Sequence, residues 1–324
     1  MKHINLIIVG ATGLVGKEVL KILEEKDIPI NRLKLAASGK SAGKEIVFKG
    51  NYYRVEEISE LMFNGMDFAI FSAGKEVSLR YAPIAAKVGT TVIDNSNAFR
   101  MDKDVPLVIP EINPHDLEKH SNIIANPNCS TIGMLMPLFP IYKKYGIESV
   151  VVSTYQAMSG AGKDFLDKYE RESRGEINDV YPIYNNVIPQ IDLFEKNGYT
   201  IEEMKMLRET QKILHDESIK VDATCVRVPV VRAHSEACFV KLKKRFKISD
   251  IRAILNDVNG VTIVDNIENL KYPTPSSVSG KNDVYVGRIR RSNIDDRALN
   301  MWIVSDNIRK GAALNAIQIL ERLL

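Results

Sequence analysis

Cys129 is the residue of this sequence best placed to act as a nucleophile. It follows the turn signal NPN and precedes an apolar run, STIGMLMPLFP, that predicts a helix. At a helix start, unpaired backbone amides and the positive end of the helix dipole favour the thiolate form of a cysteine. Cys225 and Cys238 lie inside β-branched stretches, which is typical of buried, inert cysteines. The sequence therefore predicts a nucleophilic Cys129. The alternative is that Cys129 is only a small residue packed at a helix start.

A thiolate nucleophile needs a group that moves protons, and His234 is the histidine best placed for that role. It follows a predicted strand, near Arg227 and Arg232, in the segment RVPVVRAHSE. A purely structural histidine is the alternative. Arg227 and His234 are seven residues apart, so an unbroken strand would direct their side chains to opposite faces. A bend at Pro229 would remove this difficulty.

A phosphate-binding turn is predicted in the segment GATGLVG. The segment follows INLIIV, a predicted buried strand, and precedes KEVLKILEEK, a predicted helix. Glycines at such a turn let the backbone approach a pyrophosphate, which then faces the helix N-terminus. The G-x-x-G-x-x-G spacing departs from the commoner G-x-G-x-x-G, and a plain strand-to-helix turn is the alternative. The residues predicted to bind the dinucleotide here are Gly10, Thr12, Gly13, Leu14, Val15 and Gly16.

The segment after the second predicted strand indicates which nicotinamide cofactor binds. An NAD-selective site usually has Asp or Glu there to hold the ribose 2′-hydroxyl, whereas LAASGKSAGK contains no acid. Ser38, Lys40 and Ser41 would favour a 2′-phosphate, although an ordinary solvated loop would also explain Lys40. We therefore predict NADP as the cofactor.

The composition excludes several other classes of protein. The chain has 324 residues, of which 45% are hydrophobic and 26% are charged, and this is enough for two globular domains. A net charge of +3 with interspersed acids predicts no nucleic-acid partner. No apolar run approaches the ~18 residues of a membrane span, so no membrane partner is expected. Three cysteines without paired spacing indicate a cytoplasmic protein, and the scattered histidines predict no metal site.

The elements that must position these residues fall into two groups. Up to residue 128, apolar strands alternate with amphipathic helices, which is typical of a Rossmann-type, doubly wound parallel sheet. From residue 147, β-branched stretches indicate a mostly antiparallel sheet, and a helix over 200–214 begins with a capping box of Thr200 and Glu203. We predict an α/β protein with a Rossmann domain of residues 1–128 plus 305–324 and an α+β domain of residues 129–304.

Six segments together resemble the aspartate-semialdehyde dehydrogenase family, in order and in register, and they span nearly the whole chain. They are GATGLVG, SNAFRMDKDVPLVIPEIN, NPNCSTIGMLMPL, YQAMSGAG, ETQKIL and CVRVPVVRAHSE. The resemblance implies the NADPH-dependent reductive dephosphorylation of L-aspartyl-4-phosphate to L-aspartate 4-semialdehyde. This reaction belongs to the biosynthesis of lysine through diaminopimelate, and of threonine, methionine and isoleucine. The resemblance also implies that the second domain is catalytic and forms a homodimer or a dimer of dimers.

The same resemblance implies a role for each residue that matches a family motif. Cys129 would form an acyl-thioester, and His234 would move protons and, when protonated, stabilise the thiolate. Gln156 would orient the acyl intermediate, and Arg227 would bind the substrate α-carboxylate bidentately. The other substrate-binding residues implied are Arg100, Asn128, Glu209 and Lys212, and those implied near the nicotinamide are Ser159, Gly160 and Asn307.

Several alternatives stay open. Arg100 alone would be explained by a loop-surface charge, and Glu209 with Lys212 by an exposed i,i+3 pair. Lys40 stands where many relatives have arginine, and lysine cannot grip a phosphate bidentately. An N-acetyl-glutamyl-phosphate reductase is a rival function, but its acetylated substrate amine needs no carboxylate partner such as Glu209. A catalytically silent NADP-binding paralogue is the other rival, and the complete catalytic set argues against it.

Overall fold

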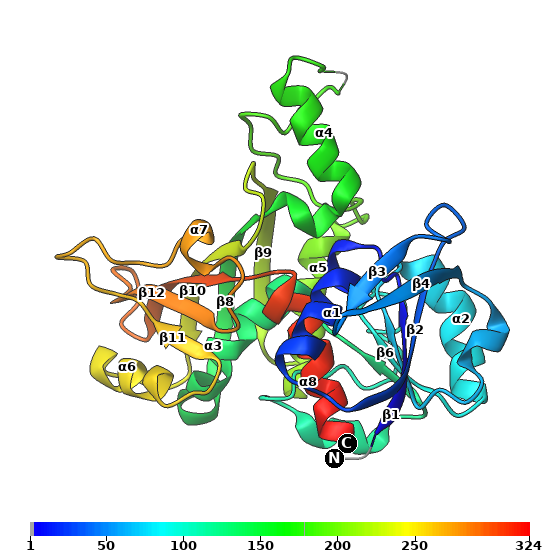
Figure 1. Cartoon of the computed structure of the whole chain (residues 1–324). Helices are drawn as coiled ribbons and strands as arrows, with labels where there is room; N and C mark the ends of the chain where they lie inside the picture. Colours follow the sequence, from blue (N-terminus) through cyan, green and yellow to red (C-terminus); the bar gives the residue numbers. More distant parts are fainter. Residues whose placement is uncertain (1–2, 178) are drawn as a thin grey trace. The chain divides into compact units, whose positions relative to one another are not determined.

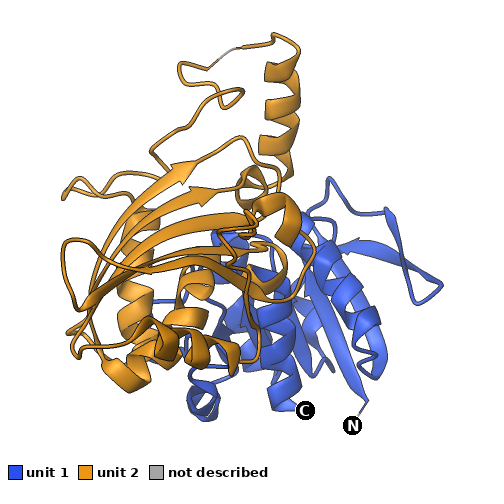
Figure 2. Cartoon of the chain, turned by 90° about the vertical axis from the view of Figure 1, so that its left-hand side faces the viewer, with its two compact units in different colours: residues 1–128, 312–324 blue, residues 129–311 orange. Residues whose placement is uncertain are grey.

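The chain folds as two compact units. The computed structural model describes residues 3–177 and 179–324 (Figure 1). One unit is Met1–Asn128 with Ala312–Leu324, and the other is Cys129–Gly311 (Figure 2). The predicted fold class is confirmed, since the first unit holds a parallel sheet and the second a mostly antiparallel one. No helix in the described part of the chain is long and apolar enough to cross a membrane.

The first unit is a seven-stranded sheet in the order β3-β4-β2-β1-β5-β6-β7. All neighbouring strands are parallel except in the β3–β4 hairpin. The strands are β1 (Ile4–Val9), β2 (Ile30–Ala37), β3 (Glu45–Phe48), β4 (Asn51–Glu57), β5 (Phe68–Phe71), β6 (Thr91–Asp94) and β7 (Ile123–Ala125). Two short 3₁₀ helices, η1 (Glu60–Phe63) and η2 (Pro114–Lys119), lie in its connections.

Helices cover both faces of this sheet because its central strand is apolar on both sides. Leu6 and Ile8 of β1 pack in one core with the helices α1 (Leu14–Glu25) and α8 (Leu314–Leu323). Ile7 and Val9 point the other way and pack in a second core with the helix α2 (Lys75–Lys87). The sequential strands run outward from β1 in both directions, so the carboxyl end of β1 is a topological switch point.

The second unit is a six-stranded sheet in the order β11-β12-β13-β10-β8-β9. Three neighbouring pairs are antiparallel, and β11–β12 and β8–β9 are parallel. The strands are β8 (Ile147–Gln156), β9 (Lys220–Arg227), β10 (His234–Leu242), β11 (Val261–Ile263), β12 (Val284–Arg291) and β13 (Ala298–Ser305). The other elements are α3 (Cys129–Tyr145), η3 (Met158–Ala161), α4 (Lys163–Ser173), α5 (Ile201–Leu214), α6 (Ile248–Asn256) and α7 (Pro275–Val278). The π-helical turn η4 (Arg309–Ala313) begins in this unit and ends in the first.

The helices α3, α5 and α6 lie on one face of this second sheet, and the short helix α7 packs against Val304 on the other. The long helix α3 contacts four of its strands, with α5 and α6 beside it. Side chains alternate along β8, so Val150 and Val152 are buried while Val151 and Tyr155 are exposed. Figure 1 shows α4 extending away from this sheet. The second unit therefore keeps one sheet face with exposed apolar side chains.

The segment 305–311 lies with the second unit, although the sequence prediction assigns it to the first. Its contacts explain this placement. Asp306 forms an ion pair with Arg232 at 2.6 Å and accepts a hydrogen bond from the Gly280 amide at 2.6 Å. The chain returns to the first unit from Ala312.

Candidate active site

Cys129 is the first residue of α3. Its side chain is partly exposed, whereas Cys225 and Cys238 are buried, and burial raises the pKa of both buried thiols. A Cβ added at Gly311 would lie only 2.7 Å from the Cys129 Cβ, so a glycine is needed beside the thiol-bearing residue. Sequence reasoning missed Gly311. The signal that could have indicated it was the position of this glycine shortly after the predicted site residue Asn307.

Arg227 and His234 converge on one residue, Ala157. Arg227 Nη1 donates to the Ala157 carbonyl at 2.6 Å, and the Ala157 N–H donates to His234 Nδ1 at 2.9 Å. The seven-residue spacing is no obstacle, because β9 ends at Arg227 and β10 begins at His234 on the other side of β8. The turn between the strands contains Pro229, as the predicted bend requires.

Burial favours the neutral ring of His234, and one hydrogen bond assigns the position of its proton. Its pKa is lowered to about 3, first by burial and second by the Arg227 charge, with Glu202 acting in the opposite direction. Because Nδ1 accepts a hydrogen bond, the proton of the neutral ring is assigned to Nε2. Nε2 has no hydrogen-bond partner among the described residues. The resting site therefore offers an N–H donor here, and not the imidazolium expected from the sequence.

Arg227 supplies the positive charge near the thiol. Burial lowers the pKa of its guanidinium, and the charges of Glu202, Cys129 and Cys225 act in the opposite direction. The guanidinium also lies over the ring of Phe165, 5.8 Å from its centroid. The electrostatic support for a thiolate at Cys129 thus comes from Arg227.

The residues predicted near the nicotinamide lie in the same cluster. A Cβ at Gly160 would lie 3.1 Å from Arg227 Nη1 and 3.4 Å from His234 Nε2, so glycine leaves the space in front of both groups open. Asn307 Nδ2 donates to Ser159 Oγ at 3.1 Å, and Asn307 Oδ1 accepts from the Ala233 amide at 3.0 Å. Asn307 therefore fixes the turn that leads into His234.

Gln156, the last residue of β8, is buried and held at both ends of its amide. Thr154 Oγ1 donates to Gln156 Oε1 at 2.9 Å, and Gln156 Nε2 donates to Glu202 Oε1 at 3.0 Å. Lys205 Nζ lies 2.9 Å from the other oxygen of Glu202. Sequence reasoning missed Glu202, because a contact between residues 46 positions apart leaves no local pattern.

The helix α5 carries the other predicted substrate ligands of this unit. Its predicted capping box is confirmed, with the Glu203 amide donating to Thr200 Oγ1 and the Thr200 amide donating to Glu203 Oε2. Glu209 is 1% exposed and Lys212 is half-buried. The burial of Glu209 rules out a fully solvated i,i+3 pair. Glu209 follows Glu202 by seven residues, which places both carboxylates on one face of the helix.

Glu236 is a buried carboxyl, two residues after His234 on β10, that has no predicted role. Neither of its oxygens has a hydrogen-bond partner among the described residues, and burial raises its pKa well above the ordinary value. Its Oε1 would be 3.2 Å from a Cβ at Gly133, one helical turn beyond Cys129 on α3. Burial therefore favours the neutral form of this acid, which packs against the helix that begins with the thiol.

In the first unit, the glycine turn has the form of an anion cradle. Gly10 has φ +87°, and a Cβ there would lie 2.6 Å from the Ser72 carbonyl oxygen. A Cβ at Gly16 would lie 2.3 Å from the Gly10 oxygen. The helix α1 begins at Leu14, and in the described chain no side chain caps its first amides and no acid occupies its first turn. With Thr12, Gly13 and Val15 this turn fits a dinucleotide pyrophosphate.

The turn after β2 presents the residues predicted to read the 2′-position. Ser38 and Lys40 are exposed, and the Ser41 amide donates to the Ser38 carbonyl at 2.8 Å. A Cβ at Gly39 would lie 3.0 Å from Glu57 Oε1. The sequence prediction considered only acids following β2, but Glu57 reaches this turn from β4, where it pairs with Ala37.

Arg100 and Asn128 are both buried in the first unit. Arg100 Nη2 donates to the Asn95 carbonyl at 2.8 Å, and its charge acts on Asp94, whose pKa is raised by burial. Arg100 is therefore held at the carboxyl end of β6 and is not a loop-surface charge.

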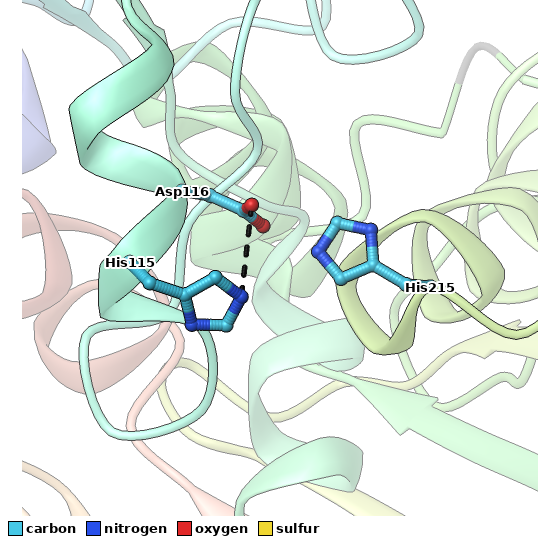
Figure 3. A group of neighbouring side chains, drawn as sticks. All are labelled: His115, Asp116 and His215. Atoms are coloured by element: carbon cyan, nitrogen blue, oxygen red, sulfur yellow. Dashed lines mark ion pairs between the residues drawn. The ribbon is translucent and has the colours of Figure 1, made fainter.

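A further polar group surrounds Asp116 in the first unit (Figure 3). His115 Nε2 lies 3.8 Å from Asp116 Oδ1, Lys119 Nζ lies 2.8 Å from the same oxygen, and Asn113 Nδ2 donates to Oδ2 at 2.7 Å. A lysine and an amide thus already engage both oxygens of Asp116. His215, also drawn, belongs to the second unit.

Comparison with known proteins gives concordant matches along the chain. The family described as semialdehyde dehydrogenase, NAD binding domain, matches residues 5–120. The family described as semialdehyde dehydrogenase, dimerisation domain, matches residues 138–310. Aspartate-semialdehyde dehydrogenases from Aquifex aeolicus and Bacillus subtilis are 49% and 45% identical, and each match covers 99% of this chain and 98% of the relative.

Solved structures are similar over the same length. Aspartate semialdehyde dehydrogenase II from Vibrio cholerae, complexed with ASA, has a TM-score of 0.96 and 44% identity, covering 100% of this chain and 98% of that chain. Aspartate semialdehyde dehydrogenase with NADP from Candida albicans has a TM-score of 0.78 and 25% identity, covering 99% of this chain and 98% of that chain.

Proposed function

Because this chain belongs to the aspartate-semialdehyde dehydrogenase family, we propose that it reduces L-aspartyl-4-phosphate to L-aspartate 4-semialdehyde, with release of phosphate. The observation that carries this proposal is the convergence of Arg227 and His234 on Ala157, in the unit whose α3 begins at Cys129. In the proposed reaction, Cys129 would be the nucleophile, His234 a hydrogen-bond donor and Arg227 the carboxylate-binding group.

The chemistry begins with the Cys129 thiolate. Its sulfur attacks the acyl carbon, a C–S bond forms, and the bond from carbon to the phosphate oxygen breaks, so that phosphate leaves with the electron pair. A bound nicotinamide nucleotide, in its reduced form, supplies the hydride that converts the thioester to the aldehyde. When the tetrahedral adduct collapses, the C–S bond breaks and Cys129 is released as a thiolate. Throughout, His234 offers its Nε2–H to the negative charge that develops on oxygen or sulfur.

Substrate selection would come from charged groups. The Arg227 guanidinium would bind the α-carboxylate, and the buried Glu209 carboxylate would pair with the free α-amine. Arg100 and Lys212 would bind the phosphate, with Asn128 as a further ligand. A free amine suits Glu209, and an acetylated one does not, so this set favours aspartate semialdehyde over the N-acetylglutamate analogue.

The decisive assay is phosphate-dependent NADP reduction by L-aspartate 4-semialdehyde, compared with N-acetyl-L-glutamate 5-semialdehyde. We expect turnover with the first substrate and little with the second. Faster turnover of the acetylated substrate would overturn the assignment in favour of the rival reductase. No turnover of either, in a folded protein that binds NADP, would indicate the silent paralogue.

Cys129→Ala should abolish this turnover and leave NADP binding, measured by fluorescence titration, nearly unchanged. Cys225→Ala and Cys238→Ala are the matched controls, because both thiols are buried. They should lower stability but retain activity. Loss of activity in a folded Cys225 or Cys238 variant, with Cys129→Ala active, would show that the nucleophile was wrongly chosen.

For the cofactor, the proposal is NADP in preference to NAD. Ser38, Lys40 and Ser41 support it, whereas the Glu57 carboxylate beside Gly39 would repel a 2′-phosphate. Lys40→Ala should therefore raise the KM for NADP several-fold, with little change in the KM for NAD. Glu57→Gln should lower the KM for NADP. Equal use of both cofactors by the parent enzyme would contradict the proposal.

The proposed assembly is a homodimer that buries the face of the six-stranded sheet opposite α3, in keeping with the dimerisation-domain match. Val151 is 48% exposed on that face, and the ring of Tyr155 lies 5.5 Å from the ring of Trp302. Sedimentation should show a dimer, or a dimer of dimers, and Val151→Glu should shift it toward monomer. A dimer unaffected by this change would place the interface elsewhere.

A cytoplasmic location also stays a prediction.

A further inference from the structure

Two adjacent glutamates begin α5, and they reach in different directions. Both Glu202 and Glu203 are buried in the first turn of the helix. Glu203 accepts hydrogen bonds from the amides of Thr200 at 2.6 Å and Cys225 at 3.0 Å, so it caps the helix and ties it to β9. Glu202 accepts from Gln156 Nε2 at 3.0 Å. Glu203 is thus a structural residue, whereas Glu202 contacts a residue of the proposed active site.

The contacts of Gln156 decide which way round its amide sits. A carboxylate only accepts hydrogen bonds, so Glu202 requires the NH₂ group of Gln156 to face it. The Thr154 hydroxyl can donate or accept, so it tolerates either orientation of the amide. Glu202 alone therefore selects the orientation. Reversing the amide would bring its oxygen against the carboxylate, in a site where both side chains are buried.

Glu202 is itself held in place. Its second oxygen lies 2.9 Å from Lys205 Nζ, and Lys205 also lies 3.2 Å from Asp192. The Lys205 side chain is only 17% exposed, so this pair is less screened by water than a surface ion pair. The carboxylate of Glu202 therefore has one fixed position from which to hold the amide.

We propose that Glu202 is a positioning residue that commits Gln156 to act as a hydrogen-bond donor toward the acyl group on Cys129. An amide NH₂ has two hydrogens, and Glu202 takes one of them. The second hydrogen is then available for the acyl carbonyl oxygen, where negative charge develops. This inference rests on the proposed function, and it adds the residue that orients the catalytic amide.

The experiment is a double-mutant cycle with a matched control. Glu202→Gln replaces a carboxylate, which only accepts hydrogen bonds, by an amide of nearly the same shape. We expect kcat to fall by about 10- to 100-fold, and the upper value is the effect typical of losing one hydrogen-bond donor to the oxyanion. The KM for aspartate semialdehyde should change little. In the background of Gln156→Ala, Glu202→Gln should have no further effect, because its role is exerted through Gln156. Glu203→Gln should lower thermal stability and leave kcat within about twofold.

A second readout does not depend on activity. The side-chain amide resonance of Gln156, assigned by its loss in Gln156→Ala, should move in Glu202→Gln and stay in place in Glu203→Gln. Lys205→Met provides a second variant if Glu202→Gln fails to fold, and it should move the same resonance and reduce kcat less. An inactive parent enzyme would refute the proposed function, while this resonance would still test the contact.

The inference is overturned by any of three results. The first is a kcat of Glu202→Gln within twofold of the parent. The second is an equal loss of kcat with and without Gln156, which would show a general structural effect. The third is an unmoved Gln156 resonance in Glu202→Gln.

Discussion

At the scale of single residues, Arg227 and His234 contact the backbone of the same residue, Ala157, but changes to them should have different effects. Arg227 is predicted to bind a carboxylate through its planar guanidinium, and His234 to donate a hydrogen bond from Nε2–H to the atom on which negative charge develops. Arg227 is held by the Ala157 carbonyl oxygen, and His234 is held by the Ala157 N–H. Because the two contacts are separate, one residue can bind the substrate while the other donates a hydrogen bond.

Arg227→Lys keeps a charge and loses the bidentate geometry. We expect a loss of about 2 kcal/mol of transition-state stabilisation, seen in kcat/KM, and weaker discrimination against an analogue without the α-carboxylate. His234→Gln should instead lower kcat by about 10²- to 10⁴-fold with little change in KM. Steady-state kinetics separates the two patterns. If Arg227→Lys discriminates as well as the parent, the carboxylate is bound elsewhere, and Arg232 is the next residue to test.

Single residues also show what sequence can predict about a site. The helix start at Cys129 and the strand-to-helix turn of Gly10–Gly16 were predictable because each leaves a local pattern, whereas His234, predicted to follow a strand, begins the strand β10. Glu202 and Glu57 were not predictable, because each contacts a residue that is distant in sequence. Glu202 contacts Gln156, and Glu57 lies beside Gly39. The protonation of His234 also depends on burial and on Arg227, which no spacing reveals.

At the scale of elements, α5 joins stability to the candidate site. Its first turn holds the capping box, the contact of Glu203 with the Cys225 amide, and Glu202. Loss of the cap should lower stability, whereas loss of Glu202 should act on Gln156. The first turn of α5 therefore combines a stabilising cap with a residue that contacts the candidate site.

Thr200→Ala should lower the free energy of unfolding by about 1 kcal/mol, because the Glu203 amide loses its acceptor. Urea denaturation measures this change. Thr274→Ala is the matched control, since Thr274 forms a capping box on the exposed, four-residue helix α7 and should cost less. A larger loss for Thr274 than for Thr200 would contradict the expected dependence on burial.

Most elements were predictable from sequence, and the exceptions have physical reasons. The apolar strands of both sheets and the capped helix α5 have strong periodic or capping signals. The helix α4 was not predicted, because its few apolar residues, Phe165, Leu166 and Tyr169, are only half-buried. The hairpin of β3 and β4 has a turn signal at Gly50, which has φ +75°, but its strands are short and largely exposed.

At the scale of the whole molecule, two buried groups of β10 make stability depend on pH in opposite senses. The folded pKa of His234, about 3, lies below its ordinary value of about 6.5, so its contribution to stability is lost as pH falls through that range. The folded pKa of Glu236 is raised, so its contribution is lost as pH rises above the ordinary value for glutamate. Together they confine maximum stability to an intermediate pH.

Glu236→Gln should therefore stabilise the protein more at pH 8 than at pH 5. One such group changes the unfolding free energy by at most about 1.4 kcal/mol per pH unit, and glutamine removes this dependence while keeping the shape. Thermal melts at the two pH values measure the difference. A gain that is equal at both, or greater at pH 5, would show that Glu236 is not a protonated acid in the folded state.

Ala157 has one further consequence, which concerns what genetics can detect. The groups that hold Arg227 and His234 are its carbonyl oxygen and its N–H, which every residue except proline would supply equally. An alanine scan passes over this position, because it is already alanine. Larger residues would report only on crowding, since Ala157 is fully buried. This part of the candidate active site thus depends on the backbone conformation at position 157 and not on the identity of the side chain. Only replacement of the backbone amide by an ester would reveal its contribution.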